Sequence, residues 1–340
     1  MTSTATGGVT VDAANADAFD RPGGELEQYR RELTGYCYRM LGSPFDAEDA
    51  VQDTMVRAWR GLSGFDGRSS LRSWLYRIAT NVCFDTLSGS KRRAMPVDLS
   101  PSASPPVVSS LGEPLPERTW LEPAPDGLLL PEDGDPAEVA VARESVRLAF
   151  VAALQHLPAK QRAVLILREV LRWKADEVAE LLDTSVASVN SALQRARATI
   201  SSRQLSMPGA APDPLDDEHR ALLARYVEAF EAYDIEALVA LRHEDATQSM
   251  PPYALWLSGP TDIGAWHLGP GHGCRGSRLL PVTANGQPAF AQYRPSGPGG
   301  RFDPWSLHLL RVAEGRIVSI TNFLNTDLFP LFGLPAHAES

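Results

Sequence analysis

Several features that often anchor a functional assignment are scarce in this sequence. Its 340 residues include only three cysteines, Cys37, Cys83 and Cys274, which lie far apart, with no CxxC pair and no Cys/His cluster at zinc spacing. A disulfide framework or a zinc site would need such clusters. We therefore expect no disulfide framework, no metal site and no cofactor.

Long apolar runs and an excess of basic residues are also missing. No segment approaches the roughly 18 consecutive apolar residues of a membrane-spanning helix, and the first 24 residues lack the basic-then-apolar layout of a signal peptide. The formal net charge of −10 argues against a surface coated uniformly with phosphate-binding side chains. These absences predict a cytoplasmic protein without a membrane partner, in which any nucleic-acid contact is local.

The composition is that of a folded, multidomain chain. With 44% hydrophobic and 22% charged residues over 340 positions, the sequence predicts two or three globular domains. Residues 1–24 are small and polar without periodicity, which predicts a disordered leader.

Two short helical patterns meet between Leu171 and Arg203. Residues 183–185 separate them with turn formers and a Ser suited to cap the second helix. An apolar stripe at steps of three and four follows, formed by Val186, Val189, Leu193, Ala196 and Ile200. The opposite face has amide, hydroxyl and guanidinium groups and no acid, from Ser188, Asn190, Ser191, Gln194, Arg195 and Arg197. This pattern predicts a helix-turn-helix for the DNA major groove; an ordinary antiparallel helix pair is the alternative.

The segment 25–95 is helical throughout. A first amphipathic helix runs from Leu26 to Met40 and ends at the Gly-Ser-Pro of residues 42–44. A second helix over 46–59 buries one apolar side, which leaves an exposed acidic and amide edge formed by Asp46, Glu48, Asp49, Gln52 and Asp53. Taken alone, such an edge is most often a solvated surface.

A local excess of positive charge follows. Residues 57–93 contain eight basic residues against two acids, interleaved with Phe65, Trp74, Tyr76 and Phe84. Cations bind phosphates and aromatic rings stack on unpaired bases, so this mixture predicts a single-strand-binding surface. For Trp74 a purely structural role in the core is an equal alternative, whereas Arg72 and Arg77 have no reason to be buried.

Residues 96–135 predict a linker. Ten prolines lie between Pro96 and Pro136, and nine acids stand against one arginine between residues 94 and 140. This composition predicts an extended, partly polyproline segment that buries no core. Within it, the apolar pair Trp120-Leu121 predicts a docking peptide.

Helical periodicity returns over residues 136–204, where two helices and the helix-turn-helix make a four-helix unit. A short linker, 205–214, leads to residues 215–336, which predict two helices and then a strand. Further strands are predicted near 253–257, 277–283, 289–294, 305–311 and 316–322. Glu314-Gly315-Arg316 indicates a hairpin. The expected fold is therefore multidomain, with two all-α helical domains followed by an α+β domain whose curved antiparallel sheet can enclose a pocket.

The order of these pieces resembles the extracytoplasmic-function (ECF) sigma factors of bacterial RNA polymerase. The similarity lies in DAEDAVQDTMVRAWRGL and FDGRSSLRSWLYRIATNVCFDTL before the linker and in LPAKQRAVLILREVLRWKADEVAELLDTSVASVNSALQRARATI after it. It implies that 25–95 is sigma region 2, which binds core polymerase and the minus-ten element, and that 136–204 is sigma region 4, which binds the minus-thirty-five element. The implied partners are promoter DNA and core RNA polymerase, through the clamp helices of its largest subunit and its flap.

The resemblance assigns roles to particular residues. The acidic edge of residues 46–53 would contact the clamp helices. Minus-ten DNA would meet Arg72, Trp74, Arg77, Asn81 and Asp85, with Asn81 and Asp85 where family members read a flipped base. In the second helix of the helix-turn-helix, the two arginines would lie near phosphates and the amides and hydroxyls nearer base edges. Many members carry basic residues where this chain has Asn190 and Ala192, which implies weaker phosphate attraction.

Residues 215–336 resemble a SnoaL-like domain of the ketosteroid-isomerase superfamily, a cone of curved sheet over helices. The similarity lies in ARYVEAFEAYDIEALVAL followed by EDAT. Tyr226 falls where those enzymes keep a pocket tyrosine, but Met250 stands in place of their general base and His308 in place of their second acid. A thioether accepts no proton at neutral pH, so we expect no catalytic residue. Candidate pocket residues, for a small unknown ligand, are Tyr226, Trp256, Trp266 and His308.

Sigma factors with such a domain form ECF groups in which the appended domain modulates the factor in cis, and Trp120-Leu121-Glu122-Pro123 resembles their linker signature. We expect the cone to pack against the promoter-melting domain and the Trp120 linker. One alternative is a DNA-binding regulator fused to an isomerase-like or hydrolase-like enzyme. Another is a one-component repressor, which would bind free duplex DNA without polymerase.

Overall fold

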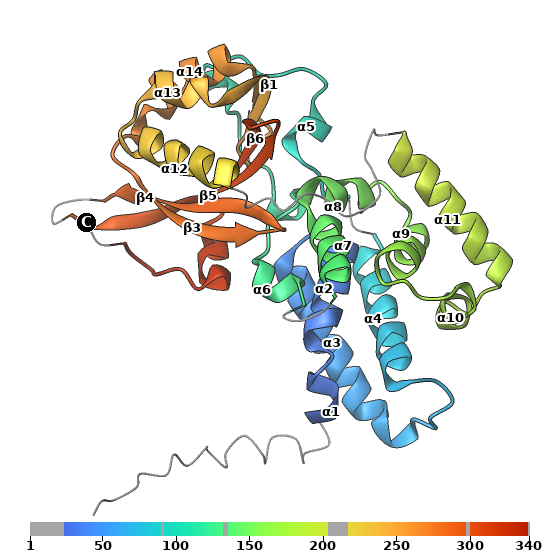
Figure 1. Ribbon diagram of the computed structural model, residues 1–340. Coiled ribbons are helices and arrows are strands. Elements are labelled where there is room, and N and C mark those ends of the chain that lie inside the picture. The colour runs from blue at the N-terminus through green and yellow to red at the C-terminus, as the bar shows by residue number, and fades with distance from the viewer. Residues whose placement is uncertain (1–23, 90–91, 132–134, 203–216, 297–299, 339–340) are drawn as a thin grey trace, which may run out of the picture.

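The computed structural model describes residues 24–89, 92–131, 135–202, 217–296 and 300–338. Two helical bundles lie on one side of the molecule and a cone built on a curved sheet on the other, as Figure 1 shows. The predicted leader, apart from Gly24, and the predicted second linker lie outside the described residues. Within the described ranges, no helix is long and apolar enough to cross a bilayer.

The first bundle contains the helices of the sequence up to residue 87. They are α1 (Gly24–Glu27), α2 (Arg30–Leu41), α3 (Pro44–Gly61), the short 3-10 turn η2 (Leu62–Gly64) and α4 (Leu71–Leu87). Gly42 ends α2 in the left-handed conformation, at φ 77°, and Ser43 caps α3 by accepting from the Asp46 N–H. The predicted stop at residues 42–44 is confirmed, while the expected single helix over 26–40 is interrupted between α1 and α2.

The second bundle holds the helix-turn-helix. Its elements are α7 (Pro136–Val146), α8 (Leu148–Leu154), α9 (Ala159–Leu165), the π-helix η5 (Ile166–Val170), α10 (Ala175–Leu181) and α11 (Val186–Ser201). Arg147 has a ψ of 136°, so the first of the two helices expected before the helix-turn-helix is divided into α7 and α8. The predicted cap at Ser185 is confirmed, because its side chain accepts from the Ser188 N–H at 3.1 Å. Val186 is 43% exposed, because it begins the helix at the turn rather than lying along the packed stripe.

The cone contains a six-stranded sheet with helices over one face. Its elements are α12 (Asp217–Glu231), α13 (Ile235–Ala240), β1 (Arg242–Ser249), β2 (Trp256–Ser258), α14 (Pro260–Leu268), η6 (Pro270–Cys274), β3 (Arg278–Ala284), β4 (Gln287–Pro295), β5 (Phe302–Ala313), β6 (Arg316–Phe323) and η7 (Thr326–Phe332). The five predicted strand positions are confirmed within a few residues, and so is the hairpin at Glu314-Gly315, where both residues have positive φ.

The strand order is β2-β1-β6-β5-β4-β3. The expectation of a fully antiparallel sheet was wrong at one place, because β1 and β6 pair in parallel. The last strand continues the antiparallel meander from β5 and lies beside the first strand on its other edge. In Figure 1, α12, α13 and α14 lie together over the sheet, which encloses the interior of the cone.

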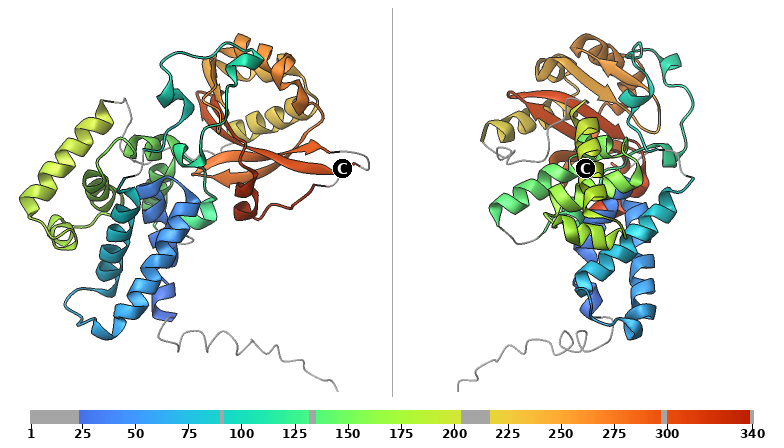
Figure 2. Two further views of the ribbon diagram at one scale, coloured as in Figure 1. Left: turned by 180° about the vertical axis from the view of Figure 1, so that it is seen from behind. Right: turned by 90° about the vertical axis from the view of Figure 1, so that its right-hand side faces the viewer.

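The segment between the bundles is not the extended, coreless linker that its composition predicts. It carries α5 (Pro96–Leu99), η3 (Val108–Ser110), η4 (Glu117–Thr119) and α6 (Asp126–Leu129), and Figure 2 shows it passing along the cone before it returns to the helices. The Ser104 and Leu115 amides donate to backbone carbonyls of the cone, and Leu121 and Leu129 are buried. The few apolar side chains of this segment pack against the folded domains, so the segment needs no hydrophobic core of its own.

One cluster of buried residues runs through both bundles, the linker and the cone. It includes Tyr36 of the first bundle, Leu165 of the second, Leu121 of the linker and Tyr293 and Phe329 of the cone. The cone and the helical bundles therefore share one hydrophobic core in this structure.

Candidate polymerase and promoter interfaces

The outer face of α11 carries the side chains assigned to promoter recognition. Its buried stripe packs toward α9 and α10, which turns the opposite face to solvent. Ser188 is half-buried, and the exposed members are Asn190, Ser191, Gln194, Arg195 and Arg197. The helix therefore presents a continuous amide, hydroxyl and guanidinium surface, as a helix in the major groove requires.

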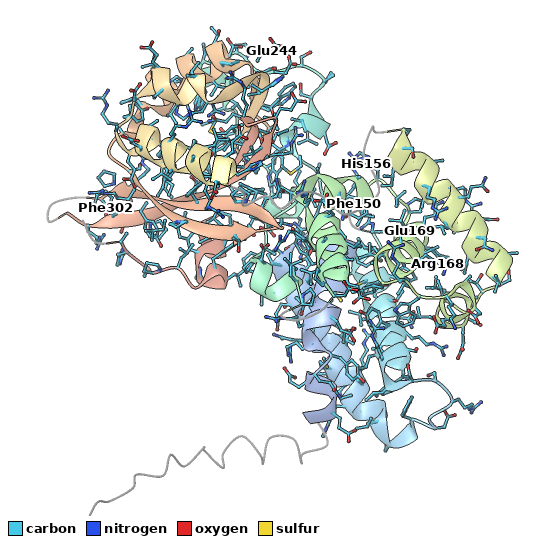
Figure 3. The ribbon with its side chains drawn as sticks, in the orientation of Figure 1. Phe150, His156, Arg168, Glu169, Glu244 and Phe302 are labelled. Atoms are coloured by element: carbon cyan, nitrogen blue, oxygen red, sulfur yellow. The ribbon has the colours of Figure 1, made fainter. Side chains whose placement is uncertain are left out.

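One of the two arginines on this face already has an acidic partner. Arg197 Nη2 forms an ion pair with Glu169 Oε1 of η5. Figure 3 labels Glu169 and Arg168 on the segment that joins α9 to α10. Arg195 is exposed on the same helix. The two arginines thus differ in how readily they can reach a phosphate.

Arg72 on α4 is held between the two bundles. Its Nη2 lies 2.8 Å from Glu32 Oε2, and its guanidinium lies 5.3 Å from the Tyr76 ring centroid and 5.4 Å from that of Trp173. Trp173 follows η5 and belongs to the second bundle. The expectation that Arg72 has no reason to be buried was wrong, because an acid and two aromatic rings hold it half-buried.

The next turns of α4 also face the second bundle. Arg77 Nη2 donates to the Glu180 carbonyl of α10 at 2.9 Å. Asn81 is exposed and lines, with Arg77 and Phe84, a groove of ≈ 700 Å³ between α4 and the helix-turn-helix. The surface assigned to minus-ten DNA therefore faces α10 here.

The other two residues assigned to minus-ten DNA lie at the sides of α4. Trp74 is half-buried, with its ring centroid 5.1 Å from that of Phe65. Asp85 is exposed, and its Oδ2 lies 3.4 Å from Arg57 Nη1. Trp74 thus packs against Phe65, as a core residue would, and is also partly exposed, as a DNA contact requires.

The acidic edge of α3 is exposed in part. Asp49 and Gln52 are exposed, with Gln52 donating to Glu48 at 3.3 Å. The carboxylates of Glu48 and Asp53 pair with Arg30 at 3.3 Å and with Arg57 at 2.8 Å. Asp46 is turned toward the linker, where its Oδ2 lies 2.5 Å from Arg93. Four of the five side chains thus remain on the outer edge, and Asp46 serves an internal contact.

A two-residue turn of the cone joins the bundles to the linker. We call Asn285-Gly286, between β3 and β4, the latch turn; Asn285 is fully buried. Its Oδ1 accepts from the Ala124 N–H at 3.0 Å, and its Nδ2 donates to Tyr38 Oη at 2.7 Å and to the Val146 carbonyl at 2.6 Å. One amide side chain thus bonds to α2, to the linker and to α7.

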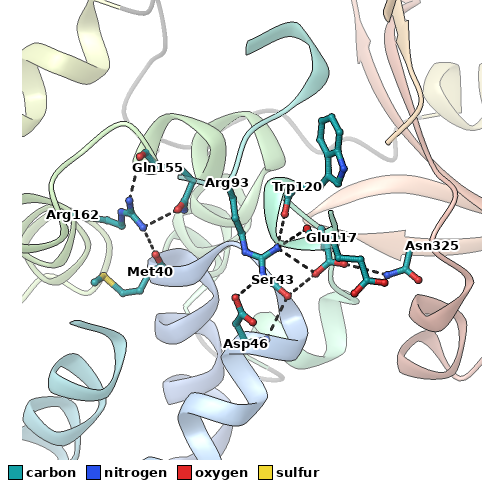
Figure 4. A network of polar contacts seen from close by, with 10 residues as sticks. Met40, Ser43, Asp46, Arg93, Glu117, Trp120, Gln155, Arg162 and Asn325 are labelled. Atoms are coloured by element: carbon teal, nitrogen blue, oxygen red, sulfur yellow. Dashed lines mark hydrogen bonds and ion pairs between the residues drawn. The ribbon is translucent and has the colours of Figure 1, made fainter. Parts of the chain in front are cut away.

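The linker is fixed beside the latch turn by a polar network, shown in Figure 4. Arg93 Nη1 donates to the Trp120 carbonyl at 2.6 Å. The Glu122 carboxylate accepts from Ser43 Oγ at 2.6 Å and from Asn325 Nδ2 of the cone at 3.2 Å. Burial raises the pKa of Glu122, the hydroxyl and amide donors oppose that rise, and Arg93 opposes it as a cation. Trp120 and Leu121, the predicted docking residues, are 3% and 0% exposed.

Buried polar contacts also join the two bundles directly. Arg162 of α9 donates to the Met40 carbonyl of α2 and, at 2.7 Å, to Gln155 Oε1. Arg39 Nε of α2 donates to Ser145 Oγ of α7 at 3.0 Å. Burial lowers the pKa of both arginines to about 10, which still leaves them charged at neutral pH.

Inside the cone, two of the predicted pocket residues bond to each other. Gln292 Nε2 donates to Ser277 Oγ at 2.9 Å, so its Oε1 is the atom that faces His308 Nε2 at 3.0 Å. An amide oxygen only accepts, so Nε2 carries the imidazole proton and Nδ1 accepts from the Tyr226 hydroxyl at 2.9 Å. Burial lowers the pKa of His308 to about 3, which leaves it neutral.

None of the described residues that line the cavity of the cone is Asp or Glu. Met250 lines the cavity at the position of the expected general base, and the Tyr226 proton is committed to His308. Trp266 also lines the cavity, but Trp256 does not. The prediction of Trp256 as a pocket residue was wrong: it lies on edge strand β2, and its Nε1 donates to the Ser100 carbonyl of the linker at 3.3 Å.

Several residues of these interfaces were missed by sequence reasoning. Asn285-Gly286 is a hairpin signal, but nothing in the sequence says that the turn is buried against another domain. Glu32, Arg93 and Trp173 gave no signal of their own, because each acts through a partner more than 20 residues away in the chain.

Family models match three segments of the chain. Residues 26–93 match Sigma-70 region 2, residues 147–200 match Sigma-70 region 4, and residues 223–320 match the SnoaL-like domain. The α3–α4 face falls within the first segment, nearly all of the helix-turn-helix within the second and most of the cone within the third. They define a two-domain RNA polymerase sigma factor with an appended cone.

Similar proteins narrow the class. The chain is 48% identical over 314 residues to the ECF RNA polymerase sigma factor SigG of Mycobacterium tuberculosis, covering 91% of this chain and 82% of that one. It is 26% identical over 320 residues to SigJ of the same organism, covering 90% and 92%. The crystal structure of SigJ matches with a TM-score of 0.60 at 22% identity, over 92% of this chain and 99% of that one. The chain belongs to the ECF family of RNA polymerase sigma factors.

Proposed function

We propose that this chain binds core RNA polymerase and directs promoter-specific initiation, and that its cone domain restrains this activity by holding the two helical bundles closed. The first part is the activity of the ECF family, to which the chain belongs. The second part rests on the contacts between the three domains. Because sigma factors act with polymerase in the bacterial cytoplasm, we place the chain there.

The observation that carries the restraint is the position of the second bundle over α4. Arg77 donates to the Glu180 carbonyl, and Arg72 lies against the Trp173 ring. If these arginines bind the minus-ten strand, α10 must first move away from α4. The outer face of α11 is already exposed, whereas the minus-ten surface of α4 lies against α10, so polymerase has to separate the bundles before both promoter elements can be bound.

The latch turn supports a role for the cone in this closure. Asn285 bonds at the same time to Tyr38 of the first bundle and to Val146 of the second. Because the cone is tethered to both, each contact forms at an effective concentration of roughly millimolar, and modest bonds suffice. We infer that the cone favours the closed arrangement and that loss of the latch turn shifts the population toward the open one.

The residue assignments remain part of this proposal. The exposed acids of α3 suit a contact with polymerase, Arg77, Asn81 and the ring of Trp74 suit an unpaired strand, and the outer face of α11 suits a major groove. An enzymatic role for the cone is not favoured, since both ring nitrogens of His308 already have partners and Met250 cannot take a proton. We propose that the cone is regulatory rather than catalytic.

The test is run-off transcription with purified core polymerase, using Asn285→Gly in the full-length chain. Glycine keeps the left-handed turn and removes only the amide. The matched control is Glu314→Gly, at the equivalent turn position of the β5–β6 hairpin, where φ is 53° against 56° at Asn285 and the side chain is exposed.

We expect Asn285→Gly to raise transcription at limiting polymerase and Glu314→Gly to leave it unchanged. Equal transcription from the parent and from Asn285→Gly would rule out the hypothesis that the cone restrains the sigma factor. Failure of the parent to bind core polymerase would instead remove the assignment as a sigma factor, so the two parts fail separately.

A further inference from the structure

A second cavity lies between the linker and the cone, and we call it the linker cavity. Its volume is ≈ 250 Å³. One water needs about 10–15 Å³ by this measure, so the space is too large for a single water and suits a small organic molecule. Linker and cone both contribute to its wall, through Glu117, Trp120 and Glu122 on one side and Pro251, Pro252 and the segment 323–328 on the other.

Several polar groups of this wall already have partners. The Pro251 carbonyl accepts from the Leu324 N–H at 2.9 Å, and the Pro252 carbonyl accepts from the Leu115 N–H at 2.8 Å. The Glu122 carboxylate is held by hydroxyl and amide donors and lies 3.8 Å from a guanidinium. These contacts fix the shape of the cavity, and they leave the groups involved little capacity to bind a ligand.

Two acids and one indole N–H are the strongest binding groups that remain. Glu117 and Asp327 are exposed, and neither takes part in an ion pair among the described residues. Trp120 is 3% exposed, and its Nε1, which can only donate, has no hydrogen-bond partner among them. Figure 4 shows the Trp120 indole apart from the polar network, with its nitrogen toward the cone.

The remainder of the wall is mainly apolar. The rings of Pro251 and Pro252 lie beside Phe323 and Leu328, which are 2% and 0% exposed. None of the described residues in the wall is Lys, Arg or His. A ligand that matches this wall brings a positive charge for the two acids, an apolar body for the prolines and an oxygen that accepts from the indole N–H.

We propose that the linker cavity binds a small organic cation of the quaternary ammonium alcohol class. Such a cation spreads its charge over methyl groups, so it loses little hydration at an apolar wall, and aromatic rings attract it as well. Because both linker and cone form the wall, the ligand binds the docked linker and stabilises it. Binding itself does not depend on the proposed restraint, whereas any lowering of transcription by the ligand rests on it.

The experiment uses choline on the full-length protein, by calorimetry and saturation-transfer NMR at an ionic strength held constant with sodium chloride. One comparison compound is the neutral analogue of choline in which carbon replaces the ammonium nitrogen. The other is ethyltrimethylammonium, which lacks only the hydroxyl. We expect saturable binding of choline, at least about tenfold weaker binding of the neutral analogue, and roughly three- to tenfold weaker binding of ethyltrimethylammonium. No saturable binding of choline, or equal affinity for all three compounds, would overturn the proposal.

Variants on both sides of the cavity locate the site. Glu117→Gln removes a charge from the linker, and Asp327→Asn removes one from the cone. The matched control is Glu113→Gln, another exposed glutamate of the linker, which does not line the cavity. We expect choline affinity to fall about three- to fivefold in each of the first two variants and to stay at the parental value in the control. Parental affinity in both cavity variants, or the same loss in the control, would contradict the site.

Amide exchange tests whether the ligand stabilises the docked linker. The Leu115 N–H joins the linker to the Pro252 carbonyl in the wall of the cavity. Choline at about ten times its dissociation constant should slow exchange of this amide about tenfold, since it binds the docked form. Unchanged exchange would contradict binding between linker and cone. These readouts need neither polymerase nor promoter, so they fail separately from the proposed function.

Discussion

The Asn285 side chain offers a direct way to weaken the closed arrangement. In Asn285→Gly the backbone keeps its turn, and the Asn285 N–H still donates to the Ala124 carbonyl. The Ala124 N–H and the Val146 carbonyl lose their side-chain partner, whereas Tyr38 Oη keeps its bond to the Glu122 carbonyl at 2.7 Å. Two stranded buried groups cost about 1–3 kcal/mol each, and we take about 3 kcal/mol in total because water can reach the loosened turn.

A cost of about 3 kcal/mol corresponds to roughly a hundredfold increase in the open population. Amide hydrogen exchange measures this change where the linker docks, since the Glu122 N–H bonds to the Gly42 carbonyl and the Ala124 N–H to Asn285. We expect both amides to exchange roughly 30- to 100-fold faster in Asn285→Gly and at the parental rate in Glu314→Gly. Rates within twofold of the parent, or the same acceleration in the control, would contradict a role of the Asn285 side chain in docking the linker.

Three further outcomes follow from the structure. Gly42→Ala places a Cβ 2.5 Å from Leu121 Cδ2 at a φ of 77°, so urea unfolding should show a loss of at least about 1–2 kcal/mol; a neutral result contradicts the docked linker. Burial depresses the pKa values of His267 and His308 in the cone to about 3, so the unfolded chain binds more protons than the folded one below pH 6.5. The free energy of unfolding should therefore fall by about 4 kcal/mol from pH 7 to pH 5. His308→Gln should remove about half of that loss, and an unchanged pH dependence would count against a neutral, buried His308. Arg195→Ala should lower the salt dependence of promoter binding by the holoenzyme by about one phosphate contact, whereas an unaltered slope would remove Arg195 from the DNA surface.

The local structure follows closely from the sequence because its signals are local. The cap at Ser185, the stop at Gly42 and the hairpin at Glu314-Gly315 each depend on residue types a few positions apart. The apolar stripe of α11 was predicted in the same way. Only Val186 is not buried as expected, because the helix begins there. The two helical domains and the cone followed from these elements and from the family resemblance.

The interfaces between domains could not be predicted in the same way. The linker composition indicates an extended chain, yet Leu121 is fully buried, because a few apolar side chains suffice when another domain supplies the rest of the core. Arg72 looked exposed because the partners that hold it, Glu32 and Trp173, lie far away in sequence. The burial of Arg242, which is 4% exposed, could not be predicted from the sequence. The cost of burying a charge depends on tertiary surroundings that a strand pattern does not report.

Restraint by closure requires that α4 separates from the helix-turn-helix when polymerase binds. The distance between labels at the exposed residues Ser63 and Ser201, in a chain with Cys274 replaced, reports it directly by energy transfer. We expect one short distance in the free protein, a longer one with core polymerase, and a shift toward the longer one in Asn285→Gly alone. A distance that stays the same when polymerase binds would contradict the claim that closure restrains this sigma factor.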